Sequence, residues 1–300
     1  MLPQLARHPA ARGLLDDAAV LPLPLGDELV ATHDMLAEGV HFTDACPPED
    51  VGWKLAAVNL SDLAAMGARP LGLLAGLGAG AGRDPAWAQA VMRGVAAAAD
   101  RYAAPLLGGD TVRLLGPSAL GLTALGHVPP GAALGRSGGR PGDELWVSGT
   151  IGDAGLGLRV VSGELPPDRR LVARYRRPEP RLALGLALRG VASACIDVSD
   201  GLLLDAWRLA EASGAAADIE EAAIPLSPAG RMSGLAPRAL ATLGDDYELL
   251  FAAPPHAAER VAELAGALRL PLARIGRLGP GSGLRLDGQP VEGPLGHLHA

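Results

Sequence analysis

The sequence contains two cysteines, a single lysine and no long apolar segment. Cys46 and Cys195 lie far apart and belong to no C-x-x-C motif, which favours two free thiols over a disulfide or a zinc site. No apolar run reaches the ~18 residues that a membrane span requires, and residues 1–12 contain no apolar core of signal-peptide length. We therefore expect a soluble, cytoplasmic protein without a membrane partner.

Positive charge is also scarce. Lys54 is the only lysine, and the formal net charge at pH 7 is −7. Proteins that grip nucleic acid through its phosphates need a basic surface, so the composition argues against a nucleic-acid partner. The P-loop pattern G-x-x-x-x-G-K-[ST] is absent, because Lys54 does not lie in a glycine-rich loop.

Short apolar runs alternate with helical stretches along the chain, which predicts a mixed α/β or α+β fold. The 300 residues are 49% hydrophobic, enough for a sizeable core. The segment 131–142 is rich in Gly, Arg and Pro and is predicted to connect two domains that divide near residue 135. Strands are predicted at 28–33, 71–77, 104–107, 119–127, 144–148, 195–198 and 247–252, helices at 48–66, 85–102, 153–161, 180–189, 201–212 and 255–268, and a hairpin at 284–291.

Aspartates recur at the ends of these predicted elements, where a scaffold presents its functional groups. Several carboxylates brought together repel one another unless cations lie between them, and short oxygen ligands suit Mg²⁺. The alternative for each aspartate is a helix cap or a turn, which explains Asp62 poorly because it lies in mid-helix. The aspartates concerned are Asp16, Asp17, Asp34, Asp62, Asp110, Asp197, Asp200, Asp245 and Asp246.

A phosphate-binding segment and a substrate contact are further candidates. In Gly108-Gly109-Asp110, the glycines would let backbone N–H groups approach a phosphate while the aspartate holds a metal ion. Arg136 suits a phosphate clamp, with solvated surface charge as the alternative. His41 is a candidate substrate contact because it follows the Asp34 segment and precedes Phe42. No Ser-His-Asp order or Cys-His pair stands out.

Taken together, these segments resemble the thiamine-monophosphate kinase family of the AIR synthase-related superfamily. They occur in the order of that family and span about residues 13–252. The segments Glu38-Gly39-Val40-His41-Phe42 and 57–68 carry the most specific resemblance. The other matching segments are 16–19, 32–37, 54–56, 108–111, 136–138, 140–143, 196–202 and 246–249.

The resemblance implies a two-domain PurM-like α/β (α+β) fold. Residues 1–135 would form an N-terminal ATP- and Mg-binding domain that dimerises through its sheet, and residues 136–300 a C-terminal AIR synthase-related domain. It also implies a homodimer that transfers the γ-phosphate of ATP to thiamine monophosphate with the help of Mg²⁺. Because the acceptor is already a phosphate, with a second pKa near ~6, no general base is expected among the catalytic groups.

The same resemblance implies three sets of site residues. The Mg²⁺ ligands would be Asp17, Thr32, His33 (through its backbone), Asp34, Asp62, Asp110, Asp197 and Asp200; the ATP contacts would be Gly109, Asp110, Arg136 and Ser199; and the substrate contacts would be His41 and Asp245.

The sequence departs from the family at some of these positions. Leu15 stands where the family has Gly, His33 where it has Thr, and Asp245 where it has the longer Glu. An aromatic residue expected near the C-terminus has no clear match. These departures leave two alternatives open: an AIR synthase-related enzyme with a different acceptor, and a non-catalytic nucleotide-binding protein.

Overall fold

The computed structural model describes residues 2–14, 21 and 23–297. Its contacts divide the chain into two compact units, of which the first is Met1–Leu63 with Ala68–Gly131 and the second is Ala64–Gly67 with Ala132–Ala300. The segment 131–142, predicted to be a connector, contains neither helix nor strand.

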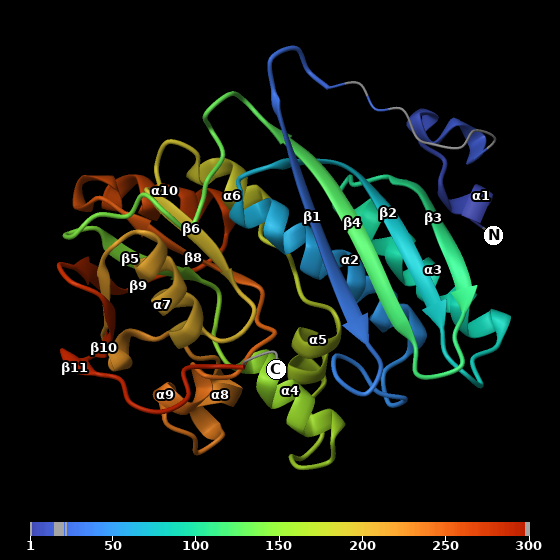
Figure 1. Cartoon of the computed structure of the whole chain (residues 1–300). Helices are drawn as coiled ribbons and strands as arrows, with labels where there is room; N and C mark the ends of the chain where they lie inside the picture. The colour runs from blue at the N-terminus through green and yellow to red at the C-terminus, as the bar shows by residue number, and fades with distance from the viewer. Residues whose placement is uncertain (1, 15–20, 22, 298–300) are drawn as a thin grey trace. The chain divides into compact units, whose positions relative to one another are not determined.

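The first unit is built on a four-stranded sheet with the strand order β1-β4-β2-β3 (Figure 1). The strand β4 pairs antiparallel with β1 and with β2, whereas β3 pairs parallel with β2. The elements in chain order are α1 (Leu2–Leu5), the 3-10 helix η1 (Pro9–Leu14), β1 (Glu28–Ala37), α2 (Pro48–Ala65), β2 (Arg69–Ala79), α3 (Pro85–Arg101), β3 (Leu106–Arg113) and β4 (Ala119–Val128).

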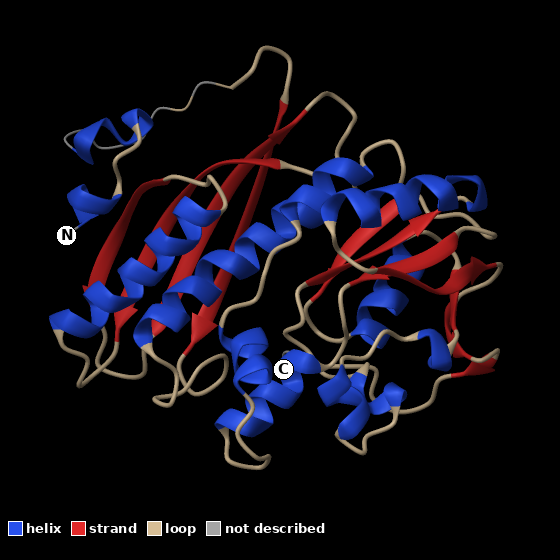
Figure 2. Cartoon of the chain, turned by 180° about the vertical axis from the view of Figure 1, so that it is seen from behind, coloured by secondary structure: helices blue, strands red, loops and turns tan. Residues whose placement is uncertain are grey.

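The helices α2 and α3 cover one face of this sheet (Figure 2). Side chains alternate between the two faces along each strand, and Leu36, which points toward the helices, is only 2% exposed. We call the other face the open face. Its apolar side chains remain between 38% and 57% exposed at Leu29, Met35, Leu74 and Val112.

The helices α2 and α3 approach each other closely because each has a glycine at their contact. A Cβ atom on Gly52 of α2 would lie 1.8 Å from the carbonyl oxygen of Val91, and one on Gly94 of α3 would lie 1.9 Å from that of Glu49. Glycine inside a helix costs about 1 kcal/mol relative to alanine. The two glycines are therefore explained by the close approach of two backbones.

The second unit is built on a seven-stranded sheet with the order β11-β10-β7-β9-β5-β8-β6. The helix α7 packs on one face, and α6 and α10 lie on the other (Figures 1 and 2). The strands are β5 (Glu144–Ser148), β6 (Ala194–Val198), β7 (Ala216–Ile219), β8 (Glu248–Ala253), β9 (Leu272–Gly279), β10 (Gly283–Leu286) and β11 (Gln289–Pro290).

The helices of the second unit lie between these strands along the chain. Their core contribution is largest at α7, where Leu203, Ala206 and Leu209 are fully buried against the sheet. The helices are α4 (Asp153–Val161), α5 (Arg169–Arg176), α6 (Leu182–Leu188), α7 (Leu202–Ala212), α8 (Pro228–Met232), α9 (Pro237–Leu240), α10 (Ala258–Leu268) and the 3-10 helices η2 (Glu221–Ala223) and η3 (Pro255–Ala257).

Most of the predicted elements are confirmed to within a few residues. The helix α3 begins as expected, because Asp84 accepts a hydrogen bond from the N–H of Trp87 (2.8 Å) and Pro85 occupies the first turn. Both cysteines are free, as expected, and both are buried. In the part of the chain that the structure describes, no helix combines the length and apolar character needed to cross a bilayer.

Two predicted strand boundaries were wrong in ways that affect the site. The strand predicted at 28–33 continues to Ala37, so Asp34 lies inside β1 and does not end it. The strand predicted at 104–107 is in fact β3, Leu106–Arg113, so Gly108-Gly109-Asp110 is strand and not loop. Pairing with β2 supplies the backbone hydrogen bonds of this glycine-rich segment, and such pairing overrides weak local propensity.

The sequence also failed to predict α5, β7 and β9. The helix α5 is arginine-rich and buries only Leu171 and Tyr175 among its eight residues, which gives a weak periodic signal. The strands β7 and β9 pair with each other, between residues 216–219 and 276–279. Their alanines and glycines have low strand propensity, and long-range pairing with each other, of β7 with β10 and of β9 with β5 makes them strands.

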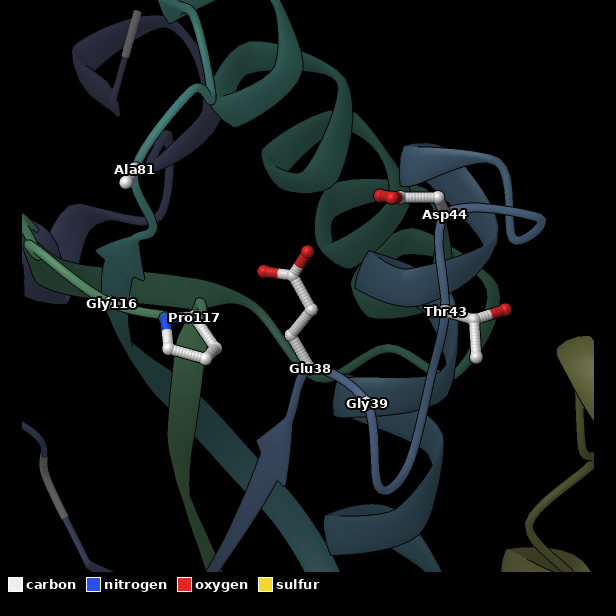
Figure 3. Close-up of a pocket in the computed structure, with 7 residues that line it drawn as sticks. All are labelled: Glu38, Gly39, Thr43, Asp44, Ala81, Gly116 and Pro117. Atoms are coloured by element: carbon white, nitrogen blue, oxygen red, sulfur yellow. The ribbon is translucent and has the colours of Figure 1, made fainter.

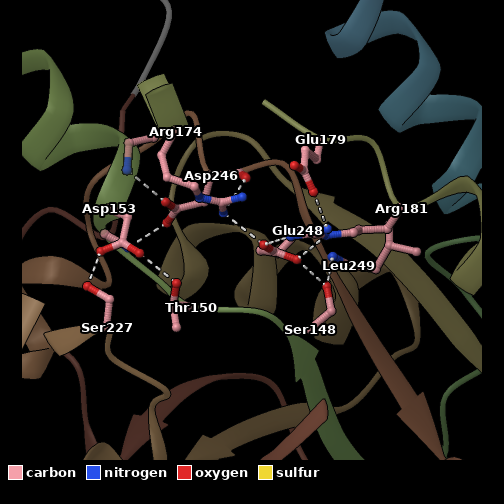
Figure 4. Close-up of polar contacts among 12 residues, drawn as sticks. Ser148, Thr150, Asp153, Arg174, Glu179, Arg181, Ser227, Asp246, Glu248 and Leu249 are labelled. Carbon is pink, nitrogen blue, oxygen red and sulfur yellow. Dashed lines mark hydrogen bonds and ion pairs between the residues drawn. The ribbon is translucent and has the colours of Figure 1, made fainter. Parts of the chain in front are cut away.

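Asp246 is a buried carboxylic acid of the second unit (Figure 4). Its carboxylate accepts hydrogen bonds from the N–H groups of Gly152 (2.6 Å) and Ala154 (3.1 Å) at the start of α4. Burial raises the pKa of Asp246 to about 7, against the opposing effects of these N–H groups and of Arg174. The native state therefore holds a proton on Asp246 at pH values where the unfolded chain has lost it.

Replacing Gly94 by alanine is expected to lower the free energy of unfolding by about 1–3 kcal/mol, because the added methyl group collides with the backbone of α2. The matched control is Gly266→Ala in α10, where nothing lies within 4 Å of the position that a Cβ atom would take and a gain of up to about 1 kcal/mol is expected. Urea denaturation followed by circular dichroism measures both. Equal effects of the two substitutions would contradict the explanation.

Asp246 is expected to make stability fall with rising pH. Its contribution is fully present below the unfolded pKa of 3.8 and is lost as the pH rises through the folded value of about 7. Between pH 5 and pH 7, the stability of the wild type relative to Asp246→Asn should fall by up to about 1.4 kcal/mol per pH unit. Urea unfolding of both proteins across this range measures the difference, and parallel stability curves would contradict it.

Candidate functional site

The strand β1 and the helix α2 bring together three of the predicted site residues. Thr32 and Asp34 project from the same face of β1, toward α2, because they are two residues apart. The hydroxyl group of Thr32 donates to the Oδ2 atom of Asp62 at 2.5 Å. We call Thr32, Asp34 and Asp62 the first acidic cluster.

The position of β1 against α2 is fixed by a buried amide. The N–H group of Asp34 donates to the Oδ1 atom of Asn59 at 2.8 Å, and the Nδ2 atom of Asn59 donates to the carbonyl of Leu55 at 2.9 Å. Asn59 has no exposed surface. Because Asn59 and Asp62 are three residues apart on α2, both face the same strand.

His33 points the other way. Its Nδ1 atom lies 2.9 Å from the hydroxyl oxygen of Thr123, on the open face of the sheet. Only the backbone carbonyl of His33 can therefore join the first acidic cluster. That is the group through which the resemblance implies a metal contact.

Asp110 does not join the first acidic cluster. The residues Asp34, Leu122, Ala75 and Gly109 form one row across the sheet, so Asp110 lies one residue further along and on the open face. The strands β4 and β2 separate β3 from β1, which corresponds to about 14 Å. One metal ion cannot contact Asp34 and Asp110 of the same first unit.

Gly109 has a structural reason to be glycine. A Cβ atom at this position would lie 2.1 Å from the carbonyl oxygen of Ala75 on β2. Close backbone packing inside the sheet therefore accounts for this glycine without reference to a phosphate. The Asp110 carboxylate accepts the N–H of Thr111 at 2.7 Å and is exposed.

The loop that contains His41 is tightly held. The Nδ1 atom of His41 accepts a hydrogen bond from the N–H of Ala37 (3.1 Å), so the neutral imidazole carries its proton on Nε2. The buried ammonium group of Lys54, 3% exposed, donates to the carbonyl of His41 at 3.4 Å. Val40, beside His41, is 66% exposed. The loop thus presents a fixed backbone with exposed side chains.

A pocket of about 400 Å³ adjoins this loop (Figure 3). Glu38 points into it and is held by the N–H of Ser118 (2.7 Å) and by an ion pair with Arg83, which also pairs with Asp44. Partial burial opposes ionisation of Glu38, but the bonds from Ser118 and Arg83 outweigh it and hold its pKa below the usual range. The lining residues are Glu38, Gly39, Thr43, Asp44, Ala81, Gly116 and Pro117.

In the second unit, Asp197 and Asp200 lie where β6 leads into α7, as predicted. Ile196 and Val198 belong to the core beneath α7. Asp197 therefore projects from the opposite face of β6, with 4% of its surface exposed. Asp200 lies beyond the strand and forms an ion pair with Arg208 at 2.5 Å.

The backbone at Ser199 and Asp200 is held by Asp205. The carboxylate of Asp205 accepts the N–H groups of Ser199 (3.1 Å) and Asp200 (3.0 Å) and pairs with Arg208. Burial raises the pKa of Asp205 to about 6, although Arg208 and the N–H of Asp200 oppose the rise. Asp205 thus fixes this turn. The sequence pattern drew attention only to Asp197 and Asp200 beside it.

The predicted substrate residue Asp245 lies beside this turn. Its N–H group donates to the carbonyl of Ser199 at 2.8 Å, and its Oδ1 atom accepts from the hydroxyl group of Tyr247 at 3.2 Å. We call Ser199, Asp200 and Asp245 the second acidic cluster. The structure therefore brings together one predicted ATP contact, one predicted metal ligand and one predicted substrate contact.

Two predicted site residues, Arg136 and Asp17, belong to neither cluster as the structure describes it. Arg136 has an exposed side chain and accepts a hydrogen bond from Ser213 through its carbonyl. Asp17 lies outside the described residues, as do Asp16 and Leu15. Within the described ranges, no three His, Cys, Asp or Glu side chains form a group able to hold a metal ion by themselves.

The donor chemistry of both clusters nevertheless fits Mg²⁺. In phosphate-binding sites this ion takes one or two carboxylates, and substrate phosphates and water complete its octahedron. Asp34, Asp62 and the Thr32 hydroxyl offer oxygen ligands in the first cluster, and Asp200 does so in the second, with Asp197 on β6 three residues before it. A soft or nitrogen-seeking metal would find no suitable ligands among these residues.

Several residues that shape the site were missed at the sequence level. Arg83, Arg174 and Arg181 hold carboxylates, whereas the sequence drew attention to Arg136. One usable signal is Glu248, which opens an otherwise apolar strand, because a carboxylate in a buried strand needs a cationic partner.

Comparison with known proteins places the chain in a family. Two family models match it: the AIR synthase related protein N-terminal domain over residues 15–128 and the corresponding C-terminal domain over residues 140–289. The chain is 42% identical to the thiamine-monophosphate kinase of Caulobacter vibrioides, over 97% of this chain and 86% of that protein.

Solved structures agree with this assignment. The thiamine-monophosphate kinase from Stenotrophomonas maltophilia K279a superposes with a TM-score of 0.88 and 41% identity, covering 96% of this chain and 94% of that one. The structure described as "AaThiL complexed with AMPPCP and TMP" superposes with a TM-score of 0.83 and 31% identity, covering 93% and 90%. The PurM-like, mixed helix-and-sheet fold and the resemblance indicated by the motifs are confirmed, and the chain belongs to the thiamine-monophosphate kinase family of AIR synthase-related proteins.

Proposed function

We propose that this protein transfers the γ-phosphate of ATP to thiamine monophosphate, forming thiamine diphosphate. The observation that carries the proposal is the presence of both acidic clusters in a chain that is 42% identical to a thiamine-monophosphate kinase. The similarity to a structure described with AMPPCP and TMP supports ATP as the phosphate donor. A cytoplasmic location fits the two free thiols, which stay reduced there.

The chemical obstacle in this reaction is repulsion between two anions. The acceptor phosphate is already partly ionised near neutral pH, so the site needs no general base. Bound Mg²⁺ would neutralise phosphate charge and align the reacting oxygens. We propose that the Mg²⁺ ligands of this chain are the groups that the resemblance implies, with Asp34 and Asp110 on different ions. They are Asp17, Thr32, the His33 carbonyl, Asp34, Asp62, Asp110, Asp197 and Asp200.

The contacts to the two substrates are proposed to be those that the resemblance implies. ATP would be contacted by Gly109, Asp110, Arg136 and Ser199. Thiamine monophosphate would be contacted by His41, whose loop is fixed by Lys54 and Ala37, and by Asp245. A fixed loop loses little conformational entropy on binding, which favours His41 as a recognition residue.

We further propose that the protein is a homodimer in which the open face of the first sheet packs against that of a second copy. Several exposed apolar side chains on one face of a sheet favour an interface, and most soluble oligomers are symmetric dimers of one chain. Met35 and Val112 on this face are 57% and 50% exposed. Asp110 lies on the same face and would therefore be at the interface and not beside Asp34.

An assay of phosphate transfer tests the main proposal. The purified protein with ATP, MgCl₂ and thiamine monophosphate should release ADP and form thiamine diphosphate, and EDTA should stop both. Parallel reactions with thiamine and with unrelated phosphate esters test for a different acceptor. ADP release with another acceptor alone, or with none, would overturn the proposal.

Asp62→Asn is expected to lower kcat/KM by about 100-fold or more, because it removes a negative charge that would hold Mg²⁺ against the phosphates. The melting temperature should stay nearly unchanged, since an amide oxygen can still accept from Thr32. Asp100→Asn, an exposed position on α3, is the control and should keep full activity. Unfolding of the Asp62→Asn protein would show instead that Asp62 is structural.

Met35→Glu is expected to convert the dimer into a monomer, because a charge on the open face would be desolvated in the interface. Met232→Glu is the matched control, since Met232 of α8 is 82% exposed and lies outside the first sheet. Light scattering coupled to size-exclusion chromatography measures the mass. A monomeric wild type, or a Met35→Glu variant that remains dimeric, would contradict the proposed interface.

A further inference from the structure

The segment that carries Asp245 has a strained backbone. Asp245 has a φ angle of +71° and Tyr247 one of +51°, in the left-handed region that residues other than glycine seldom adopt. Such conformations persist only where the surrounding structure enforces them, and they concentrate at functional sites. Two of them within three residues call for a structural cause.

The residues that alternate with these two are buried anchors. Asp246 accepts hydrogen bonds from the N–H groups of Gly152 and Ala154. Glu248 has no exposed surface. Asp246 and Glu248 thus take part in the polar contacts drawn in Figure 4, and they alternate along the segment with Asp245 and Tyr247.

Glu248 is held by two arginines and a serine. Arg181 donates to both carboxylate oxygens, from Nε at 2.7 Å and from Nη2 at 2.5 Å, and Arg174 donates to Oε1 at 2.7 Å. The hydroxyl group of Ser148 donates to Oε2 at 2.5 Å and in turn accepts the N–H of Leu249 at 3.0 Å. We call Arg174, Arg181, Glu248 and Ser148 the Glu248 clamp.

The clamp also reaches the backbone of the strained segment. The Nη2 atom of Arg174 donates to the carbonyl of Asp246 at 3.3 Å. Gly149, with a φ angle of +64°, lets Glu248 approach, because a Cβ atom there would lie 2.1 Å from Oε1. The clamp thus fixes the chain on both sides of Tyr247.

A buried ion pair adds little net stability, because desolvation offsets most of its attraction, and its best-attested use is to select one conformation. Here the selected conformation joins the segment to the turn of the second acidic cluster. The N–H of Asp245 donates to the carbonyl of Ser199, and the N–H of Tyr247 donates to that of Val198, each at 2.8 Å.

We propose that the Glu248 clamp positions Asp245 against thiamine monophosphate by enforcing the strained backbone of residues 245–247. This inference rests on the proposed function and adds positioning residues to it. The side chain of Asp245 is short, so its contact with the substrate depends strongly on the position of its backbone.

Glu248→Gln tests the proposal, because it keeps the size of the side chain and removes its charge. The matched control is Glu179→Gln, which removes an exposed partner of the same Arg181. Hydrogen–deuterium exchange of peptides covering 244–249 measures the order of the segment. Steady-state kinetics with varied thiamine monophosphate and varied ATP measures the two KM values separately.

Glu248→Gln should speed exchange at Asp245 and Tyr247 and raise KM for thiamine monophosphate about tenfold, with KM for ATP little changed. Glu179→Gln should change neither quantity. Arg181→Lys keeps the charge but loses the paired contact, and it replaces Glu248→Gln in the test if that variant does not fold. Its expected effects are the same in direction and smaller.

Unchanged exchange in a folded clamp variant would overturn the proposal. A loss of kcat with both KM values unchanged, or an equal rise in both, would also overturn it, because either indicates a general structural role. If the wild type does not phosphorylate thiamine monophosphate, the proposed function fails. The exchange data then decide by themselves whether the clamp orders residues 245–247.

Discussion

A carboxylate that leaves water needs donors around it, and this requirement shapes the second unit. Glu248, without exposed surface, is surrounded by Arg174 and Arg181. Asp246 takes two backbone N–H groups at the start of α4, and Asp205 takes two at the turn after β6. Each of these groups fixes a stretch of backbone because unpaired burial would cost several kcal/mol. The buried carboxylates of Asp205, Asp246 and Glu248 thus fix the backbone that carries Asp200 and Asp245.

The first unit uses a different constraint, the alternation of side chains along a strand. Thr32 and Asp34 face α2 because they share one face of β1, and His33 between them must face the other way. The side chain of His33 therefore belongs to the open face and does not disturb the side of β1 that carries Thr32 and Asp34. By the same geometry, Asp110 belongs to the open face, which links the proposed metal ligands to the proposed interface.

The short side chain of Asp245 depends on the backbone for its position. Here the backbone has positive φ angles at Asp245 and Tyr247, with buried anchors in alternation. The strain and the anchors together describe a segment whose position is decided by its surroundings and not by its local propensity.

The sequence by itself determined the family, the order of most helices and strands, and the oxygen-rich chemistry of the site, because these follow from local patterns and from segments that can be compared directly. It did not determine that Gly108–Asp110 lies inside a strand, that Asp34 and Asp110 occupy opposite faces of one sheet, or that Arg174 and Arg181 meet Glu248. These features arise from pairing and burial between residues far apart in the sequence, such as Asp34 and Leu122 in the first sheet and Arg174 and Glu248 in the second unit. Local propensity contains no information on such contacts, so only the tertiary structure decided them.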